Sequence, residues 1–206
     1  MTFLPGFLGS PKASVSKTDS GVTNGATYQF GPAAAGRVIA AAISVAAAGG
    51  NSITGVLLGG TAAVLIARVT FTAGDTAEIW AAVVPAGSSG AVAATVSGAL
   101  SAFGVTVYAI LNPNGVAASN TAVSATSSVN LSVPQDGVAI AVSTNVRAGG
   151  SSFTWSGLAE DTDFAIATSA QSSAASGSVS AAQNVTVTAT PSASTAQGIV
   201  AASWSP

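Results

Sequence analysis

The side chains best suited to acid–base or metal chemistry fall in one short stretch, which contains Glu160, Asp161 and Asp163. Such a cluster could bind Ca²⁺, a hard cation that takes about six to eight oxygen ligands, or supply the carboxylate pair of a glycosidase. Its spacing matches no complete Ca²⁺-binding loop, and neighbouring carboxylates on one turn cannot flank a sugar from opposite faces. The stretch therefore favours a solvated acidic turn, with ion binding as the alternative.

The other candidates for catalysis are weaker. Asp75 and Glu78 lie near another predicted turn, where we expect Asp75 to be a turn residue and Glu78 an exposed strand position. The chain contains no His and no Cys, so it lacks the commonest general base, the commonest transition-metal ligand, and any thiolate or disulfide. Segment 55–60 is not followed by the Lys-Ser/Thr pair of a phosphate loop. The sequence therefore predicts a protein that is not an enzyme and has no cofactor and no metal.

The low charge content excludes further classes of function. Of 206 residues, 5 are Lys or Arg and 7 are Asp or Glu, so the net charge is −2 and 6% of residues are charged, against 49% hydrophobic. An ordinary soluble domain has about 25% charged residues, and so small a net charge cannot steer nucleic acid or an anionic membrane. The uncharged stretch 38–67 is interrupted at 49–52 and 59–61, so its apolar runs fall short of the roughly 20 residues of a spanning helix. We expect no nucleic-acid partner and no membrane insertion.

The N-terminus carries a cluster of large apolar side chains, Phe3, Leu4, Phe7 and Leu8. It differs from a signal peptide, because no basic residue precedes the apolar part and a Pro-Gly pair interrupts it. Most termini are frayed tails, but exposed apolar clusters favour association. We assign residues 1–20 to an N-terminal apolar arm that docks on a partner or a neighbouring subunit, with a frayed tail as the alternative.

Strands are the elements that must position these residues. Runs of about five to ten residues, rich in Val, Ile and Thr, recur between Gly, Pro, Asn and Asp turn signals. Alanine is the best helix former, but the alanine runs here are short, lie beside Gly and are surrounded by β-branched residues that favour sheets. The pattern predicts an all-β chain, an antiparallel β-sandwich of about 12 strands. The predicted strands span 22–30, 37–47, 52–58, 62–73, 76–84, 91–97, 103–111, 122–133, 137–146, 152–155, 163–170, 184–190 and 197–204.

We expect residues 21–206 to form one β-sandwich domain. Segment 112–120 is either a crossover between the two sheets of this sandwich or a sub-domain boundary. The tryptophans are expected to fill the core, as large aromatic side chains usually do, and Trp204 should tie the last strand into a sheet. Trp155 is also a candidate for stacking on a sugar ring.

Seven segments, spread over residues 36–206, carry a resemblance to known proteins. The first four are RVIAAAIS (37–44), TGVLLGGTAA (54–63), AEIWAAVVP (77–85) and VAATVSGAL (92–100). The later three are PQDGVAIA (134–141), TWSGLAED (154–161) and IVAASW (199–204). Together they resemble the β-sandwich, jelly-roll-like module of phage virion structural proteins, which include head decorations, head fibres and tail appendages.

The resemblance implies a role in the virion and supplies no catalytic residues. We expect a non-enzymatic virion protein, most closely a capsid decoration or head-fibre subunit, anchored by Phe3, Leu4, Phe7 and Leu8. Its partners would be other copies of itself and other capsid or tail proteins. The alternative is a carbohydrate-binding adhesin module on a virion appendage that recognises a host surface glycan through Trp155. A surface poor in charge is poorly protected against self-association, which suits a subunit of an assembly.

Overall fold

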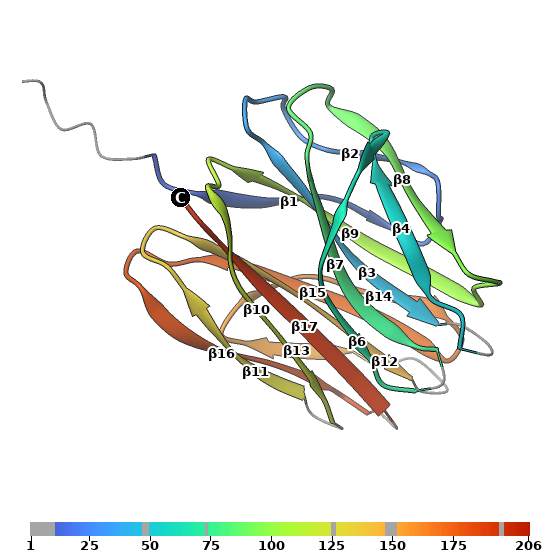
Figure 1. Ribbon diagram of the computed structural model, residues 1–206. Helices are drawn as coiled ribbons and strands as arrows, with labels where there is room; N and C mark the ends of the chain where they lie inside the picture. Colours follow the sequence, from blue (N-terminus) through green and yellow to red (C-terminus); the bar gives the residue numbers. More distant parts are fainter. Residues whose placement is uncertain (1–10, 47–49, 73, 125–126, 147–151, 194–195) are drawn as a thin grey trace, which may run out of the picture.

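The computed structural model describes residues 11–46, 50–72, 74–124, 127–146, 152–193 and 196–206, and no helix among them is long and apolar enough to cross a membrane. Antiparallel strands form four sheets (Figure 1), so the all-β prediction is confirmed. Residues up to 111 form two of these sheets. The first inner sheet has the strand order β1 (Ser14–Gly21), β9 (Ala102–Leu111), β3 (Val38–Ala46), β7 (Thr76–Val83) and β6 (Val64–Thr70). The first outer sheet has the order β2 (Thr27–Gln29), β8 (Ser89–Val96), β4 (Ile53–Leu58) and β5 (Thr61–Ala62).

Residues from 115 onward form the other two sheets. The second inner sheet has the order β10 (Gly115–Val123), β17 (Ala196–Ser205), β12 (Val138–Val146), β15 (Ala170–Ser178) and β14 (Ala159–Ala167). The second outer sheet has the order β11 (Ser127–Val133), β16 (Gln183–Pro191) and β13 (Phe153–Ser156). The described residues thus contain 17 strands, more than the predicted 12 or so, because short strands and polar strands lack the apolar runs that the prediction counted.

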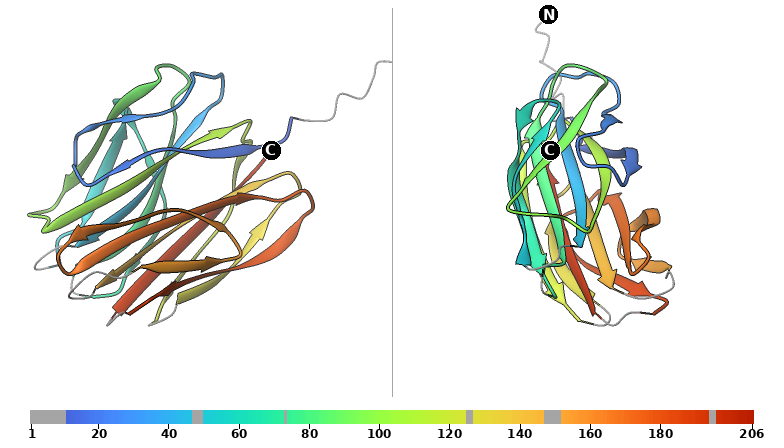
Figure 2. Two further views of the ribbon diagram at one scale, coloured as in Figure 1. Left: turned by 180° about the vertical axis from the view of Figure 1, so that it is seen from behind. Right: turned by 90° about the vertical axis from the view of Figure 1, so that its right-hand side faces the viewer.

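The sheets stack in four layers, with the two inner sheets in the middle (Figures 1 and 2). One apolar core, containing Phe30 and Leu58, fills the space between the first outer and first inner sheets. A central core, containing Ile79 and Trp204, joins the two inner sheets. A third core, containing Leu131, lies between the second inner and second outer sheets. The predicted insertion of the last strand is confirmed, since β17 pairs with both β10 and β12 and Trp204 is 1% exposed.

The inner strands are apolar on both faces because cores cover both faces. In β3, Ile39 and Ile43 face the first core, whereas Ala40 and Ala42 face the central core. A strand covered on both sides reads as a continuous apolar run instead of an alternating one. The central core between the inner sheets contains many short alanine side chains. They belong to Ala13, Ala40, Ala42, Ala67, Ala77, Ala81, Ala174 and Ala202.

The second half of the chain repeats the topology of the first. Both inner sheets place their strands in the same order, with β10, β17, β12, β15 and β14 standing where β1, β9, β3, β7 and β6 stand. In the outer sheets, β11, β16 and β13 correspond to β2, β8 and β4. Apart from the consecutive strands β4 and β5, β6 and β7, and β14 and β15, which stay within one sheet, each half alternates between its two sheets in the manner of a jelly roll. The counterparts β3 and β12 begin at Val38 and Val138 and have 9 residues each, so the chain consists of two jelly rolls of equal topology.

The two jelly rolls pack against each other about an approximate two-fold axis. β17 contacts β6 and β7, while its counterpart β9 contacts the corresponding strands β14 and β15. β3 and β12 contact each other, and the equivalent residues Ser44 and Thr144 meet, with Thr144 Oγ1 donating to Ser44 Oγ at 2.6 Å. Contacts that exchange equivalent elements are the mark of an isologous interface. The molecule is therefore built like a dimer fused into one chain.

One predicted boundary changes. Residues 14–20, assigned to the N-terminal arm, belong to β1, which pairs with β9 from Ser14 to Gly21; its polar residues had concealed a strand at the edge of the sheet. Residues 112–114 connect the two jelly rolls within the predicted boundary 112–120, and the remainder of that segment already belongs to β10. Phe3, Leu4, Phe7 and Leu8 lie outside the described residues.

Candidate functional site

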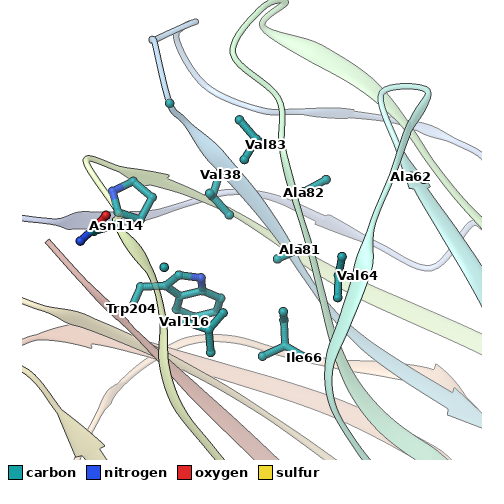
Figure 3. Close-up of a pocket in the computed structure, with 13 residues that line it drawn as sticks. Val38, Ala62, Val64, Ile66, Ala81, Ala82, Val83, Asn114, Val116 and Trp204 are labelled. Atoms are coloured by element: carbon teal, nitrogen blue, oxygen red, sulfur yellow. The ribbon is translucent and has the colours of Figure 1, made fainter.

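An exposed apolar groove lies between the two jelly rolls in the described structure (Figure 3). It has a volume of about 530 Å³, a size common for ligand or side-chain pockets. β6 and β7 form one wall, and the start of β10 with Trp204 of β17 forms the other. We call it the apolar groove; its lining residues are Gly36, Val38, Ala62, Val64, Ile66, Ala81, Ala82, Val83, Pro113, Asn114, Gly115, Val116 and Trp204.

The groove exists because two sheet edges meet there. β6 ends the first inner sheet, β10 ends the second, and the two edge strands lie against each other. Val64, Val83 and Val116 at the groove remain 67%, 57% and 45% exposed. None of the lining residues is charged. Contiguous exposed apolar surface of this kind marks an interaction site in soluble proteins, so the geometry fits the docking of an apolar partner.

The two-fold relation places a second groove on the opposite edges, and this one is polar. β1 and β14 are the counterparts of β10 and β6, and their groove has a volume of about 480 Å³. We call it the polar groove; it is lined by Lys17, Ser20, Gly21, Val22, Asp161, Thr162, Asp163, Phe164 and Ala165. The two equivalent pairs of edge strands thus carry different side chains, and only the pair at the apolar groove, β6 and β10, is suited to apolar contact.

The acidic stretch contributes to the polar groove from a strand, so the prediction of a turn was wrong. Glu160, Asp161 and Asp163 lie in β14, which pairs with β15. Tyr108 OH donates to Asp161 Oδ2 at 2.9 Å, and the Phe153 N–H donates to Asp163 Oδ2 at 2.9 Å. Within the described ranges, no group of three or more His, Cys, Asp or Glu side chains could hold a metal ion.

Burial changes the proton affinity of these groups. Desolvation, with a contribution from the Asp163 charge, raises the pKa of Glu160. Desolvation also raises the pKa of Asp163, against the opposing hydrogen bond from Phe153. Burial, assisted by Asp161, raises the pKa of the Tyr108 phenol well above its ordinary value. The polar groove therefore holds the Asp163 carboxylate, with Glu160 beside it on the same strand, at a cost that falls when these groups are protonated.

The raised pKa values of Glu160 and Asp163 predict that mild acidification increases the contribution of these two groups to stability. A carboxyl whose pKa is raised in the folded protein binds more protons there than in the unfolded chain, so stability falls as pH rises from the unfolded pKa through the folded one. We expect the variant Glu160→Gln/Asp163→Asn to be more stable than the parent at pH 7, and the difference to shrink toward pH 4. Urea unfolding at several pH values measures this difference. A difference in unfolding free energy that does not change with pH would contradict the raised pKa values of these two carboxyl groups.

A buried charge cluster lies in the first jelly roll, on the side of β7 that faces the first core. Glu78 is fully buried and accepts hydrogen bonds from Arg68 Nη2 at 2.9 Å, from Thr76 Oγ1 at 2.9 Å and from Trp80 Nε1 at 2.6 Å. The Arg68 guanidinium also lies 5.8 Å from the centre of the Trp80 ring. The expectation that Glu78 is exposed was wrong, because it points toward the first core with Trp80. Asp75 does lie in the turn after β6, where it accepts a hydrogen bond from Thr72.

Arg37 is a structural residue that the sequence did not single out. It lies between the groove residues Gly36 and Val38, and its side chain is fully buried. Among the residues that the structure describes, its guanidinium pairs with no carboxylate and donates instead to six backbone carbonyls, those of Phe30, Gly31, Pro32, Val84, Ala86 and Gly87. These carbonyls belong to the connections that precede β3 and follow β7. Arg37 thus holds together two loops at the rim of the apolar groove.

Trp155 is placed on β13 and is half-buried against the third core. Its indole N–H donates to Ser173 Oγ at 2.8 Å, and Ser173 in turn donates to the Thr162 carbonyl at 2.8 Å. The polar atom of the ring is therefore engaged within the protein. Sugar stacking on Trp155 stays a prediction, whereas Trp80 and Trp204 are buried as expected.

A local sequence signal for the apolar groove is weak, because its walls come from strands far apart in the chain. The signal that could have revealed it is the repetition of the chain at an offset of 100 residues, where Val38, Ala41 and a Gly-Gly pair recur as Val138, Ala141 and another Gly-Gly pair. The chain matches no family model, no curated protein and no solved structure in comparisons with known proteins.

Proposed function

We propose that this chain is a non-enzymatic structural subunit of a phage particle, most closely a capsid decoration or head-fibre protein that its N-terminal arm anchors. The observation that carries the proposal is the apolar groove, where Val64, Val83 and Val116 are 67%, 57% and 45% exposed in a chain with 6% charged residues. Apolar surface of this kind is costly in water and is stabilised by contact with another protein. The reference to phage particles rests on the resemblance of the seven sequence segments.

The edge strand beside the groove supports the same role. β10, with the sequence GVAASNTAV, is mostly exposed and contains neither charge nor proline. Soluble proteins usually protect such edges with charges, proline or bulges, because an exposed edge can pair with another chain. β10 has only one irregularity, a register shift between Val116 and Ala118. An edge protected so little suits a protein whose working state is an assembly.

The proposal is tested on purified particles of the phage that encodes the chain. Gold-labelled antibody against the chain should mark the particle surface in a regular array, and the chain should copurify with the particle at a fixed ratio. Removal of residues 1–9 should abolish incorporation while leaving the folding of the purified chain, followed by circular dichroism, unchanged. Unlabelled particles would overturn the proposed function, and normal incorporation of the truncated chain would overturn the role of the arm.

A further inference from the structure

The apolar groove has a candidate occupant of matching chemistry in the chain itself. Residues 1–10 contain no Lys, Arg, Asp or Glu and carry Phe3, Leu4, Phe7 and Leu8. The groove is likewise uncharged and is lined by valine, alanine and tryptophan side chains. Burying one large apolar side chain contributes about 1.5–3 kcal/mol. Contact between arm and groove would therefore shield the apolar side chains of both from water.

Residues 11 and 12, from which the arm extends, lie beside one end of the apolar groove. Asn112 Nδ2 donates to the Lys12 carbonyl at 3.2 Å, and the next residues, Pro113 and Asn114, line the groove (Figure 3). An extended chain spans about 3.3–3.6 Å per residue, so the segment from Pro11 out to Phe3 can reach about 25–30 Å. An arm of this length can enter the apolar groove of a second copy that packs against this end of the molecule.

The contacts of Lys12 favour a path of the arm toward a neighbour over a path into the chain's own groove. The Lys12 ammonium pairs with Asp136 at 2.6 Å, and the Ala13 N–H donates to the Asp136 carbonyl at 3.1 Å. Lys12 also lines a small pocket with residues 178–180 at the end of β15. In the second inner sheet, β17 and β12 separate β15 from β10, where the apolar groove opens. To fill its own groove, the chain would have to turn back across the connection between β9 and β10.

We propose that the apolar groove receives the N-terminal arm of a second copy, and that two copies exchange their arms reciprocally. The start of the arm and the apolar groove lie at the same end of the molecule. When the arm of one copy enters the groove of a partner, the partner's arm therefore lies next to the groove of the first copy. This exchange closes into a two-fold dimer and does not propagate. The inference rests on the proposed function only in treating the arm as an assembly element.

The mass of the purified chain tests the exchange. Light scattering after gel filtration should give twice the 19.5 kDa mass of the chain, and removal of residues 2–9 should halve the measured mass. Val116→Asp should also halve it, because a carboxylate in the groove opposes apolar docking. The matched control is Val123→Asp on the same strand, since Val123 and Val116 are 52% and 45% exposed but only Val116 lines the groove; this variant should remain dimeric. Thermal unfolding of each variant verifies that it is folded.

Cross-linking separates exchange from occupation of a chain's own groove. A photoreactive phenylalanine analogue at Phe7 should link to β6 or β10, and in an equilibrated equal mixture of light and ¹⁵N-labelled chains about half of the linked pairs should combine one light and one heavy chain. Links confined to single chains, or a monomeric parent, would overturn the exchange. A monomer that still decorates particles would leave the proposed function standing, whereas an arm-exchanged dimer that is found on no particle would overturn the proposed function alone.

Discussion

Replacement of Arg37 by Met should lower the free energy of unfolding by about 3–5 kcal/mol, a large part of the about 5–15 kcal/mol that stabilises a typical domain. The substitution leaves six buried or half-buried carbonyls without their donor, and each buried acceptor without a partner costs about 1–3 kcal/mol unless water replaces the donor. Burial already lowers the pKa of Arg37, which reflects the cost of placing a charge there. The six hydrogen bonds offset that cost, so their loss is not compensated by removal of the charge.

Two further variants separate the hydrogen bonds of Arg37 from its charge. Arg37→Lys keeps the charge but has three donors in place of five, so it should destabilise nearly as much as Met. Lys17→Met removes an exposed basic residue and should change stability by less than about 0.5 kcal/mol. Denaturant unfolding followed by circular dichroism measures all three. A loss below about 1 kcal/mol for Arg37→Met would show that the loops at the groove rim do not depend on the guanidinium.

The strands that sequence predicts best are those with local apolar runs between turn residues. The predicted segments 37–47, 103–111 and 137–146 match β3, β9 and β12 closely, because strands buried on both faces need apolar residues throughout. The same physics explains the failure at β15 (Ala170–Ser178), a strand inside the second inner sheet composed of Ala, Ser, Gln and Gly. Its Ser172 is buried because Ser44 donates to it at 2.7 Å across the interface of the inner sheets. A polar residue satisfied by a partner 128 positions away leaves no local signal.

The candidate site was predictable only in part, and for the same reason. The apolar arm is a local cluster and can be recognised from Phe3, Leu4, Phe7 and Leu8 alone. The groove depends on Val64 of one jelly roll and Val116 of the other, which come together only after both have folded and packed about the two-fold axis. Local periodicity assigns such valines to strands but does not say which sheet edge remains uncovered. The long-range pairing of the two halves supplies that information.

Glu78 and Arg68 show a long-range pairing whose disruption should have the second large effect. Arg68 and Glu78 are opposite each other in the register of β6 and β7, and Glu78 is fully buried whereas 26% of the Arg68 side chain is exposed. Glu78→Leu removes the carboxylate that accepts from Arg68, from the Thr76 hydroxyl and from the Trp80 indole, and leaves Arg68 its hydrogen bond to the Ile53 carbonyl. Breaking a buried pair on one side costs about 3–5 kcal/mol, and we expect a value near the lower limit, because water can reach Arg68.

A double-mutant cycle, with Arg68→Leu as the second single variant, gives the interaction energy between Arg68 and Glu78. Arg68→Leu/Glu78→Leu should recover part of the loss, since replacing both buried charges by apolar groups is often neutral, but the Thr76 hydroxyl and the Trp80 N–H remain without an acceptor in both variants. Glu78→Gln keeps a carbonyl oxygen for one of these donors and should lose less stability than Glu78→Leu. Full recovery in the double variant would assign the whole effect to the ion pair. Equal losses for Gln and Leu would instead show that the charge of Glu78, and not its oxygen atoms, holds β6 to β7.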